Sequence, residues 1–494
     1  MKTAQLHYTA QLRHARTQFA CGLALITIFG LFRAETMEGF FAYMLIVATT
    51  ILPAALWLRA GAPGIPILPA VAGLDYLYYA VPILRENVGQ AGYTAGATLR
   101  AAATLALFFV TATAIWRLVL GSIPRRAPEP AIHVTFTLPT RLLVFGGITL
   151  GLLFQLLITT DLLADVGGLF GVVRAIATTS ALIACYVLGH SRARGILRGT
   201  LWALAAAGIA SITLLSWSTL YLVGGMAYLL AAMLGYVTTA KRVPWVAAVA
   251  VLTVLFVLHA GKSEMRERYW VNGYSQTTPI TAVPSIISEW IGDGVDAIAA
   301  GDLNQDIVDR ASQLYLLLRV QRLTPEYIPY LGGETYALLP HYLVPRFLDP
   351  DKISSQAGLA LLNVRYGLQT RESVETTTIG WGVIPEAFAN FGYLGVVGAG
   401  FVFGGLVGLF SHWSVGATPL SLPTLLSAAA LVSLINPEAD FGYLMTNLWQ
   451  ALAATLLFFL LIRYLTATRE PRPSGTIAIP PRYAIRSGPN LPRM

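Results

Sequence analysis

Residues 98–120 read TLRAAATLALFFVTATAIWRLVL, and this stretch decides the class of fold. Apart from Arg100 and Arg117 it is uncharged and mostly apolar. A helix needs about 20 such residues to cross the hydrocarbon core of a membrane. The stretch therefore predicts a transmembrane helix.

The whole chain has the same apolar character. Of its 494 residues, 55% are hydrophobic and only 12% are charged, and the mean hydropathy is +0.63. Soluble domains carry about 25% charged residues. The composition therefore predicts an all-α polytopic membrane protein. The net charge of +8 does not point to nucleic acid as a partner, because Lys and Arg collect in the cytoplasmic loops of membrane proteins.

Twelve stretches of this kind predict about twelve transmembrane helices. The third is interrupted by Pro66, Pro69 and Pro82, and the seventh and eighth require a tight turn near Trp217. The stretches lie near residues 17–34, 37–58, 65–84, 98–120, 141–161, 167–189, 199–216, 218–238, 244–260, 383–410, 421–436 and 442–465.

Basic residues fix the predicted orientation, because short loops rich in Lys and Arg stay in the cytoplasm. Twelve spans with both termini in the cytoplasm place every basic cluster on that side. The first apolar run lacks a small-residue cleavage site, so we expect a retained helix. The clusters are Arg59; Arg125, Arg126 and Arg141; Arg192, Arg194 and Arg198; Lys241 and Arg242; and the tail from Arg463 onward.

This topology divides the chain into four parts. Residues 1–260 form spans one to nine, 261–382 a long outer (periplasmic) loop, 383–466 spans ten to twelve, and 467–494 a disordered cytoplasmic tail. Structureless loops as long as 261–382 are uncommon and usually functional. Its stretch 304–323 has helical spacing, with Ile307, Leu314, Leu317 and Leu318 on one face, and YLGGETY (330–336) reads as a turn. We therefore expect a partly helical loop that caps the membrane domain.

The outer loop is rich in arginine, which binds phosphate through bidentate, charge-assisted hydrogen bonds. One interpretation is therefore a site for a phosphorylated substrate. The other is a solvated surface in which arginines pair with nearby acids such as Glu264, Glu267 and Asp309. For Arg266 and Arg268, beside Tyr269 and Trp270, an interfacial aromatic belt is a further alternative. The candidate substrate-binding residues are Arg266, Arg268, Arg310, Lys352 and Arg365.

The stretch HYLVPRFLDPDK (341–352) is the strongest catalytic candidate. Pro345 and the preceding Pro340 prevent a continuous helix, so the rigid backbone would preorganise the Arg346 guanidinium. His341 could be a general base, a phosphate ligand or a surface histidine. With no second histidine nearby, a metal site is not expected.

The stretch WGVIPEAFANFGYLG (381–395) opens the tenth predicted span. Glu386 lies in its first turn, and Asn390 lies one turn further on the same face. The carboxylate could cap the helix, or it could accept a proton from a sugar hydroxyl. Gly392 and Gly395 would allow a kink or close packing.

Two charged residues inside the predicted spans are further candidates. Asp75 lies near mid-span, where a carboxylate is a functional candidate by default. Arg174 lies near the outer end of the sixth span and could face the same cavity as the outer loop. The chain contains no phosphate-binding P-loop, no GxSxG elbow and no His/Cys cluster with metal spacing, so no cofactor is expected.

The order of these motifs resembles a known family. VDRASQLYLLLRV, TPEYIPYLGGETY, LVPRFLDPDK and PEAFANFGYLG follow one another within residues 304–395. This arrangement is similar to the bacterial oligosaccharide repeat-unit polymerases, the Wzy-type O-antigen and exopolysaccharide polymerases, which are related to O-antigen ligases. The chain departs from the family pattern in SWSTLYLVGG (216–225), which lacks the arginine that many members carry there.

The resemblance implies a GT-C-like membrane glycosyltransferase in the bacterial inner membrane. It implies that a growing glycan moves from undecaprenyl diphosphate to a new lipid-linked repeat unit at the outer face, without metal or nucleotide. Donor and acceptor would both be undecaprenyl-diphosphate-linked oligosaccharides, and membrane lipid and a chain-length regulator protein are the other implied partners. Cations near the leaving diphosphate would stabilise its charge, with Arg346 as the first candidate and Glu386 or His341 as the base.

Three other functions compete with this one. An O-antigen ligase-like transferase would use the same donor, a flippase would move the lipid-linked sugar across the membrane, and a structural subunit would only support polysaccharide export. A flippase is less favoured because charged residues concentrate in the outer loop rather than in the spans.

Overall fold

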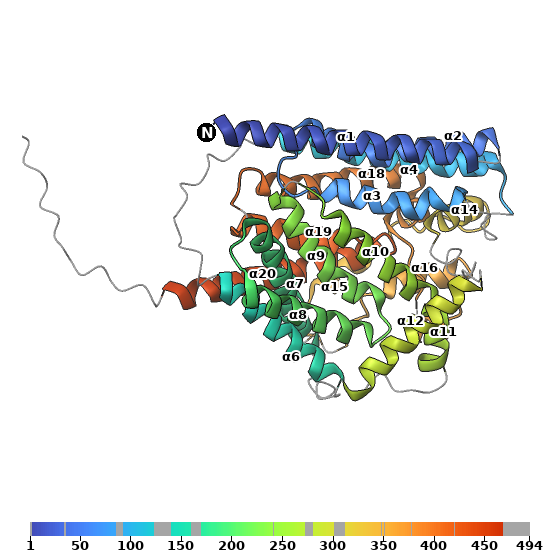
Figure 1. Ribbon diagram of the computed structural model, residues 1–494. Coiled ribbons are helices and arrows are strands. Elements are labelled where there is room, and N and C mark those ends of the chain that lie inside the picture. The colour runs from blue at the N-terminus through green and yellow to red at the C-terminus, as the bar shows by residue number, and fades with distance from the viewer. Residues whose placement is uncertain are drawn as a thin grey trace, which may run out of the picture.

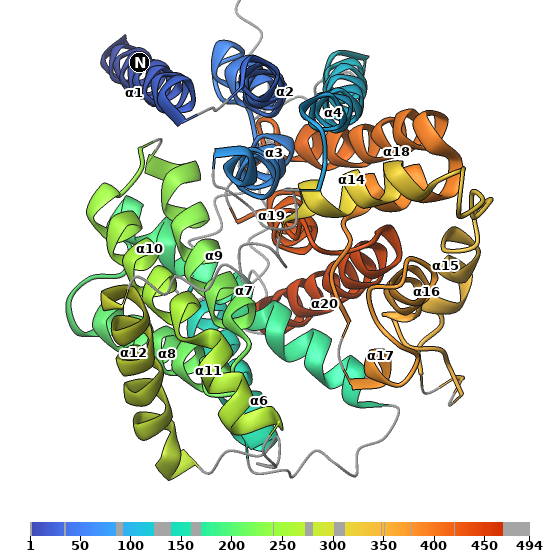
Figure 2. The same cartoon turned by 90° about the vertical axis from the view of Figure 1, so that its right-hand side faces the viewer.

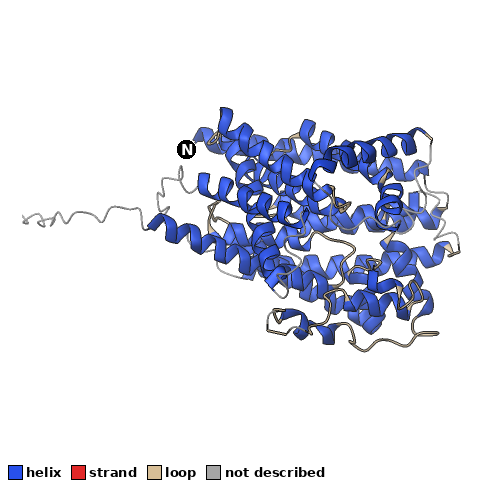
Figure 3. Ribbon diagram, turned by 90° about the horizontal axis from the view of Figure 1, so that it is seen from below, coloured by secondary structure: helices blue, strands red, loops and turns tan. Residues whose placement is uncertain are grey.

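Helices are the only regular secondary structure in the residues that the structure, a computed structural model, describes (Figures 1 and 3). These are residues 2–33, 36–84, 92–122, 140–159, 169–240, 242–271, 280–300, 312–346, 348–349, 351–376, 378–418 and 420–467. Within them there is no strand, which confirms the all-α prediction. The predicted tail 467–494 lies outside them apart from Ala467, which ends the last helix.

Ten helical segments among the described residues are long and apolar enough to cross a membrane, so the chain is a polytopic membrane protein. Two of them consist of paired elements, α3 with the short helix η1 and η2 with α6. The helices that contain them are α1 (Lys2–Arg33), α2 (Met37–Arg59), α3 (Ile67–Tyr79) with η1 (Val81–Leu84), α4 (Ala95–Ser122), η2 (Leu142–Gly146) with α6 (Gly147–Thr159), α7 (Phe170–Arg194), α8 (Gly199–Trp217), α9 (Leu222–Ala240), α18 (Val383–Ser414) and α20 (Phe441–Ala467).

Twelve full-length spans are not confirmed, because two of the predicted stretches form shorter helices. α10 (Trp245–Ala260) has 16 residues and bends by 54° into the next helical segment, so the pair counts as an eleventh span only if both halves are taken together. α19 (Leu422–Leu434) is apolar but has 13 residues. At 1.5 Å per residue it is about 20 Å long, shorter than the roughly 30 Å hydrocarbon core.

Several helices of the predicted outer loop, namely α11, α12, α14 and α16, lie towards one end of the bundle (Figure 1). The start of α1 and the end of α20 both lie at the opposite end, and Figure 2 looks onto the loop end. The loop is therefore partly helical, as predicted. Its elements are α11 (Lys262–Arg266), η4 (Glu267–Val271), η5 (Ile280–Ala282), α12 (Val283–Ala299), α14 (Gln313–Leu323), η6 (Tyr336–Leu338), α15 (Leu339–Leu343), α16 (Ala357–Arg365) and α17 (Ser373–Thr376).

The helical spacing read from residues 304–323 is confirmed for α14. Leu314, Leu317 and Leu318 are buried on it, whereas Ile307 lies outside the described residues. The predicted turn in YLGGETY is also present, and Gly332 and Gly333 both have positive φ there.

Glycines allow the spanning helices to approach closely. Gly189 of α7 faces the carbonyl oxygen of Ala232 on α9, and Gly235 of α9 faces the carbonyl oxygen of Tyr186. Gly404 of α18 faces Ala112 of α4 in the same way. Small residues at such crossings replace the hydrophobic effect, which is weak between helices in lipid, with close van der Waals packing.

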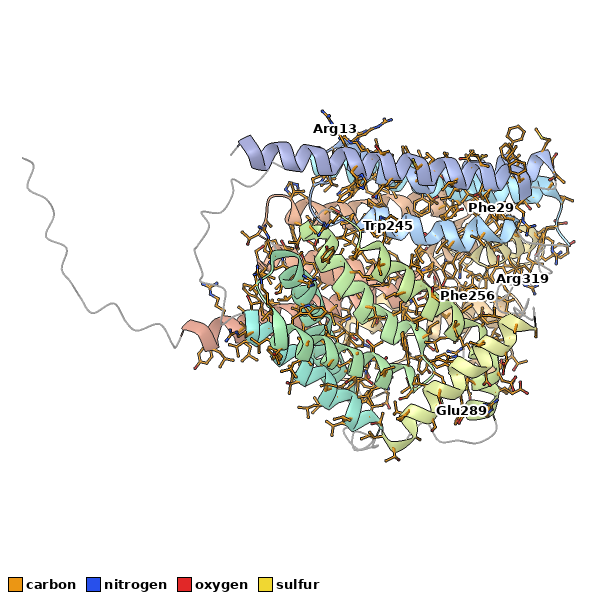
Figure 4. The ribbon with its side chains drawn as sticks, in the orientation of Figure 1. Arg13, Phe29, Trp245, Phe256, Glu289 and Arg319 are labelled. Carbon is orange, nitrogen blue, oxygen red and sulfur yellow. The ribbon has the colours of Figure 1, made fainter. Side chains whose placement is uncertain are left out.

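The outward flanks of the bundle are apolar, as lipid contact requires. Figure 4 shows Phe29 on α1 and Phe256 on α10. These side chains are 55% and 49% exposed. The tight turn expected near Trp217 is confirmed, because Trp217 ends α8 and its Nε1 donates to the Leu222 carbonyl 2.9 Å away at the start of α9.

Candidate functional site

A cavity of about 390 Å³ lies between α7, α20 and the loop segment 345–355. We call it the α7–α20 cavity. Its walls are the first two turns of α7, a loop that follows α15, and one face of α20. The lining residues are Phe170, Gly171, Val172, Arg174, Ala175, Ile176, Pro345, Arg346, Lys352, Ile353, Ser354, Ser355, Thr446, Trp449, Gln450, Ala453, Ala454 and Leu457.

Three cations line this cavity, and they come from two distant parts of the chain. Arg174 lies in the second turn of α7, whereas Arg346 and Lys352 lie in the loop after α15. The sequence predicted that Arg174 faces the same cavity as the outer loop, and the structure confirms this. It also brings Arg346 and Lys352, two of the predicted site residues, to one place.

Internal hydrogen bonds hold the loop in a closed shape. Lys352 Nζ donates to the Tyr342 carbonyl oxygen at 2.7 Å, and Arg346 Nη2 donates to the Lys352 carbonyl oxygen at 3.2 Å. Tyr342 is itself buried, and its hydroxyl accepts a hydrogen bond from the Gly358 N–H at 2.9 Å. Both cationic side chains are therefore tied to a fixed backbone, as expected for a preorganised site.

The positive charge of the cavity is not neutralised by the protein around it. Among the described residues, Arg174, Arg346 and Lys352 make no ion pair; the ion pairs seen there belong to Arg268 and Arg365. Partial burial and the charge of Arg346 lower the pKa of Lys352, and the charge of Asp349 acts in the opposite direction. A bound anion would relieve this repulsion between like charges.

The start of α7 adds to the positive potential. Phe170, Gly171 and Val172 open this 25-residue helix at the cavity wall, and Leu169 before them provides no side-chain cap. The first N–H groups of a helix carry partial positive charge and bind phosphate groups well. Three cations and a helix N-terminus in one cavity favour a ligand with more than one negative charge.

The α20 wall changes in polarity along its length. Thr446, Trp449 and Gln450 lie towards the start of α20, and Ala453, Ala454 and Leu457 follow on the same face. The Trp449 Nε1 is buried and has no hydrogen-bond partner among the described residues. Sequence reasoning missed these residues, although polar side chains three and four residues apart in an apolar span were a usable signal.

Glu386, a predicted catalytic base, is not at this cavity. Its side chain is buried, only 1% exposed, and both carboxyl oxygens accept hydrogen bonds. The Thr335 hydroxyl donates to Oε1 at 2.7 Å and the Phe441 N–H donates to Oε2 at 2.7 Å. Asn390 donates to Thr335 and to the Glu386 carbonyl oxygen, as its place one turn further suggested. In this arrangement Glu386 joins the loop, α18 and α20.

Asp440 is a second buried carboxyl group at this junction, and the sequence analysis overlooked it. Its Oδ1 accepts the Tyr443 N–H at 2.8 Å, and its Oδ2 has no hydrogen-bond partner among the described residues. Burial raises the pKa of Asp440 to about 6, against the opposing effect of that N–H. The signal was the stretch NPEAD (436–440), which places two acids between two apolar helices.

Two of the predicted phosphate-binding arginines form ordinary surface ion pairs instead. Arg268 pairs with Glu264, Glu289 and Asp293 at 3.5, 3.4 and 3.3 Å, and Glu289 is seen at the edge of α12 in Figure 4. Arg365 pairs with Glu334 at 2.9 Å. Neither lines the α7–α20 cavity, and their ion pairs agree with the alternative interpretation of a solvated, paired surface.

The remaining predicted residues are also elsewhere. Arg266 donates to the Leu220 carbonyl oxygen at 3.3 Å and lies over the Tyr221 ring, 5.9 Å from its centroid. His341 is exposed on α15 and does not line the cavity. Asp75 is buried on α3, and Arg310 lies outside the described residues.

The described residues contain no group of three or more His, Cys, Asp or Glu side chains that could hold a metal ion. No protein-family model, curated protein or solved structure matches the chain.

Proposed function

We propose that this protein is a membrane glycosyltransferase that polymerises undecaprenyl-diphosphate-linked oligosaccharides, with the diphosphate held in the α7–α20 cavity. The observation that carries the proposal is the meeting of Arg174, Arg346 and Lys352 in one cavity, without an acidic partner among the described residues. The motif order within residues 304–395 adds the glycan chemistry by its resemblance to repeat-unit polymerases. The same proposal includes a GT-C-like fold and a site at the outer face of the inner membrane. It also includes a chain-length regulator protein as a partner.

The chemistry requires a stabilised leaving group. The acceptor hydroxyl oxygen attacks the anomeric carbon and gives its proton to solvent water, the bond from that carbon to the diphosphate oxygen breaks, and the diphosphate leaves with an additional negative charge. Preorganised cations stabilise that developing charge. Arg174, Arg346 and Lys352 take this role, and the guanidinium of Arg346 can bind two phosphate oxygens at once.

The test is a mass profile of undecaprenyl-linked glycans in a host that lacks this gene. Single outward-facing repeat units should accumulate, and the wild-type gene should restore the polymer. Arg346→Ala should restore it at most weakly, because the leaving charge loses a cation. Arg365→Ala is the matched control, since Arg365 belongs to the same loop but pairs with Glu334 at the surface.

Other outcomes would identify other functions. Full-length polymer left on the lipid carrier in the deleted host would mean a ligase, and single units trapped on the cytoplasmic face would mean a flippase. Normal polymer from Arg346→Ala, at a normal protein level, would contradict the assignment of Arg346.

A further inference from the structure

One face of α20 runs from polar residues in the wall of the α7–α20 cavity to the exposed apolar flank of the helix. Residues 446, 449, 450, 453, 454 and 457 are spaced by three and four, so they form a single stripe. The first three are polar or have a polar edge, and the last three, Ala453, Ala454 and Leu457, are apolar. The α20 wall of the cavity is therefore polar at one end and apolar at the other.

The apolar part of the cavity wall reaches the flank of α20. Leu457 lines the cavity and is 55% exposed, so it belongs both to the cavity wall and to the outer surface of the helix. Leu460 and Leu461, one turn further along α20, are 49% and 51% exposed and continue the apolar surface. On a helix that crosses the membrane, this flank faces lipid chains.

The wall at this end of the cavity is apolar and includes several small side chains. Ala453 is exposed, and Ala453, Ala454 and Ala175 of α7 keep part of this apolar wall free of large side chains. A free phosphate or a water-soluble sugar phosphate would satisfy the cations, but it would leave this apolar half without a partner. An anion that carries a long hydrocarbon chain matches both halves.

We propose that the polyprenyl chain of the substrate lies along α20, past Ala453 and Leu457 towards Leu460 and Leu461, while its diphosphate contacts Arg174, Arg346 and Lys352. The substrate then reaches the cavity sideways from the bilayer. This inference rests on the proposed function for the identity of the lipid, but it makes its own claim about where that lipid binds.

Photo-crosslinking tests this path directly. A photoreactive benzoylphenylalanine replaces Leu457, and the protein is reconstituted with radiolabelled undecaprenyl diphosphate that carries no sugar. Leu118 of α4 is the control position, because it also lies on a spanning helix and is 61% exposed. We expect a crosslink at position 457 that excess unlabelled undecaprenyl diphosphate suppresses about tenfold, and only unsuppressed background at position 118. Equal, unsuppressed labelling at both positions would overturn the proposal.

A blocking variant provides a second measurement. Ala453→Trp fills the apolar wall at an exposed position, so the core packing stays intact. It should remove most of the competable crosslink, whereas Ala114→Trp, at an exposed alanine of α4, should leave it unchanged. An unchanged crosslink in Ala453→Trp would mean that the chain does not pass this wall.

The two proposals fail in different ways. Loss of polymer in Arg346→Ala without a competable crosslink at position 457 would refute the lipid path and leave the polymerase function standing. A competable crosslink together with normal polymerisation in a host lacking the gene would refute the polymerase function and leave the lipid path standing.

Discussion

Lys352 stabilises its loop through a hydrogen bond and also contributes a positive charge to the cavity. An ammonium group has three N–H donors, and one of them is engaged with the Tyr342 carbonyl oxygen at 2.7 Å. Two donors remain for a ligand. Binding of a diphosphate would therefore not require the loop to give up the bond that shapes it, so the site is already arranged before the substrate arrives.

Asp440 makes a pH-dependent contribution to stability. Its pKa in the folded protein is about 6, above the ordinary value of 3.8, so the neutral form is the one that the fold prefers. The contribution is fully present below pH 3.8 and is lost as the pH rises through about 6. In Asp440→Asn, which cannot ionise, we expect this loss to disappear.

The measurement is thermal unfolding in detergent from pH 4 to pH 7, for wild type and variant. The melting temperature of Asp440→Asn should rise relative to that of wild type across this range. Asp349→Asn, at a half-buried position in the loop after α15, serves as the control. A constant difference between the two proteins across the range would show that Asp440 is ionised throughout.

At the residue scale, the sequence identified several charged residues of the site but not the residues that they contact in the fold. Arg346 and Lys352 were identifiable because prolines and charges interrupt an apolar chain, and Arg174 because a charge in a span is rare. The pairing of Arg268 with Glu289 and Asp293 was not predictable, since it depends on how α12 folds back over α10. Burial of Glu386 depends in the same way on Thr335, which is distant in sequence.

At the scale of helices, α7 is positioned by its close crossing with α9. A Cβ added to Gly189 would meet the backbone carbonyl oxygen of Ala232, which cannot move without shifting α9. We expect Gly189→Ala to destabilise the protein by about 1–3 kcal/mol, measured as unfolding in detergent. Because α7 carries Arg174, the variant should also bind undecaprenyl diphosphate more weakly.

The control for this variant is Gly73→Ala on α3, where a Cβ would meet nothing within 4 Å. The better helix propensity of alanine should make that protein slightly more stable, by up to about 1 kcal/mol. Equal stability of the two variants would mean that the α7–α9 crossing is not tightly packed.

The sequence predicted that α18 could be kinked, but it did not predict at which residue. Gly392 and Gly395 both allow a break, and the structure breaks the helix at Gly392, which has φ of 60° and ψ of −143°. The Tyr330 hydroxyl lies against this glycine, so a contact with the loop selects the position. The same holds for α10 and α19, whose apolar composition predicted spans but whose ends are set by packing.

For the whole molecule, the arrangement predicts which surfaces are exposed on each side of the membrane. Leu348, in the cavity loop, is 67% exposed, and Ile196, between α7 and α8, is 42% exposed. In a variant in which Cys21 and Cys185 are replaced by serine, a cysteine at position 348 should react with a membrane-impermeant maleimide in intact cells. A cysteine at position 196 should react only after permeabilisation. The reverse pattern would invert the orientation and contradict an outer-face reaction.

The short helix α19 affects how the loop and the membrane part depend on each other. A helix of about 20 Å that starts at one boundary of the hydrocarbon core ends about 10 Å short of the other. The irregular chain after it, residues 435–440, must then be shielded from lipid by protein. Phe441, directly after it, donates to Glu386 and packs its ring 6.0 Å from that of Tyr336. The outer loop therefore covers a segment that lies below the boundary of the hydrocarbon core. We expect that the outer loop and the membrane helices fold only together, so that neither can be expressed as a separate stable domain.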